Sequence, residues 1–169
     1  KKINNIQNQN KEYTGELTLG KTTPSHDLET EFIESNDLDD VTEEKINDLR
    51  KNFIGEQFQR PPRFSAVKVK GKRAYQFARK NENIEIKEKK INIHEFKISE
   101  INLPNISFMI SCTKGTYIRS IARDFGKALG CGAVLTKLRR TKIGEFDVKD
   151  AFKIDDFVNK INKEKIENS

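Results

Sequence analysis

The stretch Cys112–Gly126 constrains the fold most, because its residue pattern changes from strand-like to helix-like at a single glycine. Residues 106–110 alternate between apolar and polar side chains, which is the period of a half-buried strand. After Gly115, apolar residues recur at helical spacing as far as Gly130, which marks the stop. The sequence therefore predicts a strand, a tight turn at Gly115 and a helix that follows at once.

Tyr117 and Arg119 would lie on the first turn of this helix, and Thr116 is the residue expected to cap it. Backbone N–H groups are unsatisfied at such a corner, so an aromatic ring and a guanidinium there are suited to gripping a nucleobase and an anion. The alternative is that Tyr117 packs in the core and Arg119 is a solvated helix residue. Taken alone, this stretch slightly favours that alternative.

Apolar periodicities predict the remaining elements. Strands are expected at 11–19, 28–32, 64–69 and 143–148, with one or two more between 84 and 101. Helices are expected at 42–54, stopped by Gly55, at 72–80 and at 154–161, and residues 20–27 form a loop by composition. Residues 1–10 are expected to end an element that begins upstream, and residues 163–169 to form a polar tail.

Composition restricts the class of protein more than it identifies one. The net charge of +6 and the pI near 9.2 favour a polyanionic partner, although lysine richness alone is weak support. Cys112 and Cys131 have no metal-ligand spacing and form no disulfide framework, so two reduced thiols and a cytoplasmic location are expected. No apolar run reaches membrane-spanning length, and no signal peptide is visible. The length predicts one domain or two lobes that share a sheet.

Two basic stretches are candidates for nucleic-acid contacts. In residues 59–79, seven cations are interleaved with aromatic residues, and in residues 138–142 three of the five side chains are cationic. Cations suit phosphates and aromatic faces suit unstacked bases. The alternative is a solvated basic face over an ordinary core, and composition leaves the two readings level.

Four stretches together resemble the tRNA pseudouridine synthase B (TruB) family. They arrive in the family's order, cover residues 11–150 and are specific only in combination. They are Lys11-x-Tyr13 with Leu19-Gly20, the stretch from Pro61 to Arg79 (PPxFSAxKxxGKRxYxxAR), Cys112 to Ser120 (CxKGTYIRS), and Leu129 to Thr141 (LGCGA followed by LRRT).

The resemblance implies an α+β pseudouridine synthase fold, with a mixed, mainly antiparallel sheet flanked by helices and a cleft across the sheet. It implies isomerisation of uridine 55 in the T-arm of tRNA by base flipping, without cofactor or metal, in a monomer. Residues 1–169 would be part of the catalytic domain, without the C-terminal PUA domain that other members carry. The family's nucleophilic aspartate lies in a Leu-Asp-Pro motif, which these residues do not contain. The chain alone is therefore expected to be inactive.

The resemblance also implies roles for particular residues. Tyr13 would stack on the flipped base and serve the final proton abstraction, Tyr117 would contact the target nucleotide, and Arg119 would pair with the absent aspartate. Leu138 would line the base pocket. The expected phosphate contacts are Lys68, Lys70, Lys72, Arg73, Arg139 and Arg140.

Asp27 carries a separate hypothesis, as a second carboxylate partner for Arg119; the equally weighted alternative is that it only caps a turn. Function also has alternatives. The chain could be a tRNA-binding module without chemistry, or, with support from charge alone, an RNA scaffold of the ribosomal-protein kind.

Overall fold

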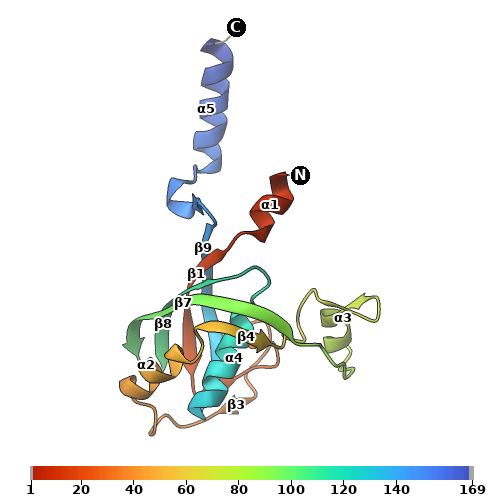
Figure 1. The fold of residues 1–169 in the computed structure, drawn as a ribbon, viewed down its shortest axis with the longest axis vertical. Helices are drawn as coiled ribbons and strands as arrows, with labels where there is room; N and C mark the ends of the chain where they lie inside the picture. Colours follow the sequence, from red (N-terminus) through yellow and green to blue (C-terminus); the bar gives the residue numbers. More distant parts are fainter. Residues whose placement is uncertain (1, 168–169) are drawn as a thin grey trace.

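A computed structural model describes residues 2–167, and its centre is a six-stranded antiparallel sheet (Figure 1). The strand order is β10-β9-β1-β8-β7-β4. The strands span Phe146–Asp147 (β10), Ala133–Ile143 (β9), Lys11–Leu19 (β1), Asn105–Cys112 (β8), Lys89–Asn102 (β7) and Gly55–Gln59 (β4). With its flanking helices, the sheet confirms the predicted α+β class.

Helices α2 (Glu43–Lys51) and α4 (Ile118–Leu129) cover one face of the sheet and close the core. Phe125 of α4 lies 5.6 Å, centroid to centroid, from the ring of Phe96 and 5.4 Å from that of Phe53. Phe96 and Phe125 are fully buried, so this aromatic cluster fixes α4 against the sheet. The position of α4 decides where its first turn points.

Strand β1 lies between β8 and β9 and follows its predicted bounds. Its register with β9 shifts between Glu12 and Tyr13 and again between Glu16 and Leu17. Between these irregularities, a Cβ on Gly15 would lie 2.3 Å from the carbonyl oxygen of Lys137 and 2.7 Å from the ring of Phe108. The strands can approach this closely only because residue 15 lacks a side chain.

The corner between β8 and α4 forms as predicted, with one exception. Gly115 adopts a φ of +81°, and Gly130 ends α4 with a φ of +83°. Thr116 does not cap the helix, because it lies one residue before the capping position; its hydroxyl donates to the carbonyl oxygen of Thr113 at 2.9 Å. The capping position belongs to Tyr117, whose side chain forms no capping bond.

Residues 60–88 form an arm that projects from one edge of the sheet (Figure 1). The arm contains a hairpin of β5 (Lys68–Val69) and β6 (Lys72–Arg73), followed by α3 (Ala74–Ala78). Lys70 and Gly71 both have positive φ, as a two-residue hairpin turn requires. The expected strand at 64–69 and helix at 72–80 are shorter than predicted, because the hairpin takes residues from both.

Several boundaries differ from expectation. Helix α2 begins after Thr42, whose hydroxyl caps it, but ends at Lys51, and Gly55 instead begins β4. Residues 28–32 form no strand; the short strand is β3 (Glu34–Ser35), which pairs with β2 (Lys21–Thr22). The expected strand at 143–148 is divided among β9, β10 and a 3₁₀ turn, η1 (Val148–Asp150).

Two terminal helices extend beyond the sheet (Figure 1). They are α1 (Lys2–Asn8) and α5 (Ile154–Glu167), which continues into the segment expected to be a polar tail. Among residues 2–167, no helix is both long enough and apolar enough to cross a membrane.

Candidate functional site

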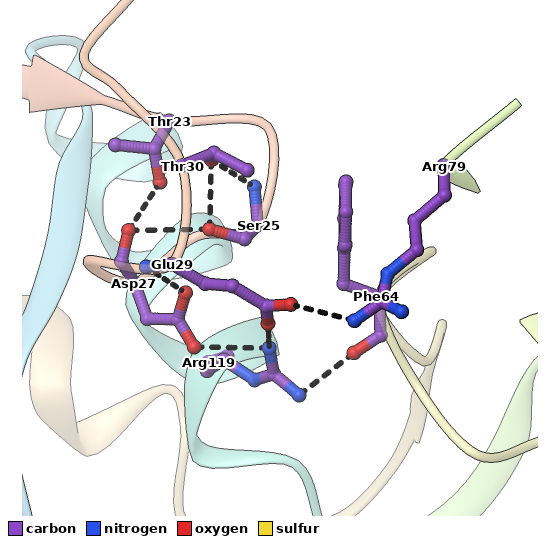
Figure 2. Close-up of polar contacts among 8 residues, drawn as sticks. All are labelled: Thr23, Ser25, Asp27, Glu29, Thr30, Phe64, Arg79 and Arg119. Carbon is purple, nitrogen blue, oxygen red and sulfur yellow. Dashed lines mark hydrogen bonds and ion pairs between the residues drawn. The ribbon is translucent and has the colours of Figure 1, made fainter. Parts of the chain in front are cut away.

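The loop that follows β2 presents Asp27 in a fixed orientation (Figure 2). The hydroxyls of Thr23 and Ser25 donate to its carbonyl oxygen at 2.7 and 3.2 Å. Its carboxylate oxygen Oδ1 accepts from the backbone N–H of Glu29 at 3.0 Å, a local turn of the kind that aspartate favours. The loop is therefore held by its own side chains, and Oδ2 points away from it.

Arg119, on the first turn of α4, meets that second oxygen. Its Nη1 lies 2.9 Å from Oδ2 of Asp27 and 3.7 Å from a carboxylate oxygen of Glu29, and Nη2 donates to the carbonyl oxygen of Phe64 at 2.8 Å (Figure 2). The side chains of Arg119 and Asp27 are only 22% and 24% exposed. These contacts exclude the reading of Arg119 as a solvated helix residue, and Asp27 does more than cap a turn.

Glu29 links the site to the arm. Its other carboxylate oxygen lies 3.9 Å from Nη2 of Arg79, which follows α3. Both side chains of that outer pair are about half exposed or more, so this link is weaker than the pair between Asp27 and Arg119.

A cavity of about 500 Å³ opens beside Arg119. Leu138, which is 47% exposed, contributes an apolar wall. The full lining is Asp27, Leu28, Glu29, Arg119, Leu135, Thr136, Lys137 and Leu138. Three of the predicted site residues, Asp27, Arg119 and Leu138, thus meet at one cavity with charged and apolar walls.

His26, directly before Asp27, has a left-handed backbone with φ of +63°, which is uncommon for a residue with a side chain. Its carbonyl oxygen accepts from the N–H of Leu135 at 3.0 Å, so the loop is tied to β9. Burial lowers the pKa of His26 from 6.5 to about 4, and the positive charge of Arg123 acts in the same direction. The imidazole is therefore neutral at pH 7.

Tyr13 lies on β1 opposite Arg140 of β9 and packs against the core. Burial raises the pKa of its phenol, and the positive charge of Arg140 opposes that rise without cancelling it. The hydroxyl therefore stays protonated at neutral pH. Neither Tyr13, on β1, nor Tyr117, at the start of α4, is among the residues that line the cavity beside Arg119.

Comparison with known proteins decides the family. The profile described as the TruB family pseudouridylate synthase N-terminal domain matches residues 1–118, and that of the tRNA pseudouridylate synthase B C-terminal domain matches residues 119–169. The chain belongs to the TruB family of pseudouridine synthases. A TruB relative, tRNA pseudouridine synthase B of Flavobacterium johnsoniae, is 53% identical over 91% of this chain and 67% of its own length.

A second TruB relative, from Chloroherpeton thalassium, is 46% identical over 96% of the chain and 68% of its own length. Among solved structures, a Cbf5-Nop10-Gar1 complex matches 93% of the chain with a TM-score of 0.67 and 27% identity, although the match covers 37% of that longer protein. An H/ACA RNP bound to a substrate RNA containing 2'-deoxyuridine matches with a TM-score of 0.64 at 23% identity, which supports the fold alone. The predicted family and fold are thus confirmed.

The six residues predicted to contact phosphates lie in two places in this TruB chain. Lys68, Lys70, Lys72 and Arg73 are exposed on the hairpin of the arm, and Arg139 and Arg140 are exposed on β9. Their contacts with RNA stay predictions. Among the described residues, no group of three His, Cys, Asp or Glu side chains is arranged to hold a metal ion.

The sequence reasoning overlooked two residues that contact the site. Glu29 could have been suspected, since it stands two positions after Asp27 in the same loop. Gln59 gave no signal, because its contact with Tyr117 joins residues that are 58 positions apart.

Proposed function

We propose that the protein isomerises uridine to pseudouridine at position 55 in the T-arm of tRNA, after flipping the base out of its loop. The main support is the Arg119–Asp27 pair, which is partly shielded from solvent at the edge of a cavity that Leu138 also lines. The names of the TruB relatives support tRNA as the substrate class. Extrusion of the target would cost on the order of a few kcal/mol, which contacts in the cavity must offset.

The reaction breaks the bond between N1 of uracil and C1' of the ribose, turns the base, and forms a bond between C5 and C1'. The proton on C5 is then lost and N1 gains one, so the product is an isomer of the substrate. No electron is gained or lost overall and no group leaves, so the balance calls for a base that removes the C5 proton and a source of the proton that N1 gains. The nucleophile is the role that the family assigns to its aspartate.

Arg119 would orient the nucleophilic aspartate of the family's Leu-Asp-Pro motif, which is absent from these 169 residues. Among the described residues, its contacts with Asp27, Glu29 and Phe64 engage Nη1 and Nη2, so Nε–H is available to a further carboxylate. Charge-assisted hydrogen bonds of this kind favour the ionised, nucleophilic form of a carboxylate. Asp27 would restrain the guanidinium from the other side.

The two tyrosines would hold the flipped uracil, Tyr13 by stacking and Tyr117 through the target nucleotide. The raised pKa of Tyr13 supports a neutral stacking partner. To abstract the C5 proton, the phenol would first have to give up its own proton, because the base is the phenolate, which takes the C5 proton and returns to the phenol. The positive charge of Arg140, which pairs with Tyr13 across β1 and β9, would favour that phenolate.

The exposed cations of the arm and of β9 would hold phosphates of the T-arm. A tRNA substrate and two unpaired cysteines support a cytoplasmic location. The monomeric state and the extent of the catalytic domain stay predictions.

One experiment tests the substrate assignment. Protein from the complete reading frame is incubated with tRNA and with a T-arm stem-loop, each labelled with tritium at C5 of uridine, and with matched RNAs that carry cytidine at position 55. Tritium release that requires uridine 55 is the expected result. Release that is unchanged by the cytidine substitution would contradict it.

The second candidate function is a tRNA-binding module without chemistry, favoured by the exposed cations on the hairpin of the arm and on β9. Binding of the T-arm by the complete protein, with no tritium release at any enzyme concentration, would establish this alternative and exclude the first.

A further inference from the structure

The side-chain amide of Gln59, the last residue of β4, forms two hydrogen bonds with the backbone of Tyr117. Its Oε1 accepts from the N–H of Tyr117 at 2.8 Å, and its Nε2 donates to the carbonyl oxygen of Tyr117 at 3.1 Å. The residue is only 5% exposed. Only asparagine and glutamine carry a neutral amide that accepts and donates in this way, and a buried amide is costly unless both functions are satisfied.

These two hydrogen bonds hold Tyr117 at a point in the chain that belongs to neither a strand nor a helix. Tyr117 stands between β8 and α4 with an extended backbone (φ −101°, ψ 109°), and no side chain caps the helix there. Its carbonyl oxygen accepts from Ser120 and Ile121 of the first turn of α4, but its N–H lies outside the helix ladder. The amide of Gln59 therefore pairs with Tyr117 much as a neighbouring strand would.

The residues that follow Gln59 in the sequence also form hydrogen bonds with the first turn of α4. The carbonyl oxygen of Arg60 accepts from the hydroxyl of Ser120 at 2.9 Å, and that of Phe64 accepts from Nη2 of Arg119 at 2.8 Å. Pro61 and Pro62 between them are buried, and because proline has no N–H this burial leaves no donor unpaired. Segment 59–64 thus holds Tyr117 at one end and the guanidinium of Arg119 at the other.

We propose that Gln59 is a positioning residue, which sets the direction of Tyr117 and Arg119 without touching the substrate. The inference rests on the proposed function, because it takes both residues as parts of the active site. Loss of the amide frees the peptide of Tyr117 to rotate, and small displacements of catalytic groups are costly in rate. RNA affinity should change little, because the proposed function assigns it mainly to the exposed cations of the hairpin and of β9.

The variants are Gln59→Leu, which removes both bonds, and Gln59→Glu, which keeps the acceptor and loses the donor at neutral pH. Gln57→Leu is the matched control: Gln57 lies two residues before Gln59 on β4, and its amide donates to the carbonyl oxygen of Phe53 at 2.6 Å. Each variant is made in the protein from the complete reading frame. Single-turnover tritium release and the Kd for tRNA are measured separately.

Gln59→Leu is expected to slow single-turnover release by about 10- to 100-fold, with the Kd within about threefold of wild type. Gln57→Leu should stay within about threefold in both. For Gln59→Glu, the rate relative to wild type should rise as the pH is lowered toward 5, because a protonated carboxyl regains a donor. The ratio for Gln59→Leu should stay constant with pH.

Hydrogen exchange at the backbone amide of Tyr117 tests its hydrogen bond with Gln59 independently of catalysis. This amide should lose protection in Gln59→Leu while the amides of β1 keep theirs, a pattern that also excludes global unfolding. Unchanged protection at Tyr117, or a Gln59→Leu rate equal to that of Gln57→Leu, would overturn the inference. Absence of release by the wild-type protein would instead overturn the proposed function, and the inference with it.

Discussion

Replacing Asp27 by asparagine tests the charge of the Asp27–Arg119 pair with little change in volume, because asparagine and aspartate have nearly the same size. The substitution removes the negative charge 2.9 Å from Nη1 of Arg119, and the single amide oxygen that remains can accept from Arg119 or from the N–H of Glu29 but not from both in the present geometry. The neutral amide of the Asp27→Asn variant should restrain Arg119 less firmly than the carboxylate does. The remaining donors of Arg119 are then less well aimed at the nucleophilic carboxylate.

The expected size follows from distance and exposure. Two unit charges about 4 Å apart attract by roughly 4 kcal/mol at an effective dielectric constant of 20. Both side chains keep about a quarter of their exposure, 22% and 24%, so solvent screening and the cost of desolvation reduce the net interaction to about 1–2 kcal/mol. If the transition state loses all of this interaction energy in Asp27→Asn, the rate falls about 5- to 30-fold.

The assay is single-turnover tritium release by protein from the complete reading frame, with the tRNA Kd measured in parallel. Asp124→Asn is the control, since Asp124 pairs with its neighbour Arg123 and is 42% exposed. We expect the control to stay within about twofold of wild type.

A double-mutant cycle with Glu29→Gln shows whether both carboxylates act on Arg119, and we expect a coupling of about 0.5–1 kcal/mol. A rate for Asp27→Asn equal to that of Asp124→Asn would refute the reasoning, because the pair would then contribute nothing to catalysis.

Three further predictions concern stability and RNA binding. Because the folded pKa of His26 is about 4 and the unfolded value is 6.5, its contribution to stability is complete above pH 6.5 and is lost as the pH falls toward 4. His26→Asn, which tolerates the positive φ, should reduce the fall in urea-unfolding free energy between pH 7 and 5 by about 1–2 kcal/mol, and the exposed control His94→Asn should not. Gly126→Ala should lower the unfolding free energy by about 1–3 kcal/mol, since the new Cβ would lie 2.1 Å from the N atom of Ala133; the exposed control Lys127→Ala should stay within about 0.5 kcal/mol, and equal stabilities would contradict the packing. Lys70→Glu in the arm should weaken tRNA binding and lessen its dependence on salt concentration, and an unchanged salt slope would place the RNA elsewhere.

The local parts of the site could be predicted from the sequence. The strand, the turn at Gly115 and the helix that carries Arg119 all depend on short-range periodicity and on the backbone freedom of glycine. The cap assigned to Thr116 was wrong because Tyr117 occupies the capping position, and Thr116, one residue before it, instead forms a local hydrogen bond to the carbonyl oxygen of Thr113. Propensity alone does not rank two such local bonds.

The convergence of distant residues could not be predicted in the same way. Asp27 and Leu138 reach Arg119 only because β1 and β9 pair and the loop is tied to Leu135. The expected strand at 28–32 failed for a related reason, since a turn centred on Asp27 satisfies the backbone there and leaves Leu28 and Phe32 exposed. Hydrophobic pattern misassigned those residues because side-chain hydrogen bonds, rather than burial, shape the loop.

The most direct test of the central claim, that Arg119 lies at the centre of an active site completed by an aspartate from outside these residues, compares tritium release by three proteins. They are the 169-residue chain, the protein from the complete reading frame, and its Arg119→Lys variant, all acting on the same labelled tRNA. We predict release by the complete protein alone, with the variant slowed by at least about 100-fold at an unchanged tRNA Kd. Release by the 169-residue chain, or full activity in Arg119→Lys, would contradict the account.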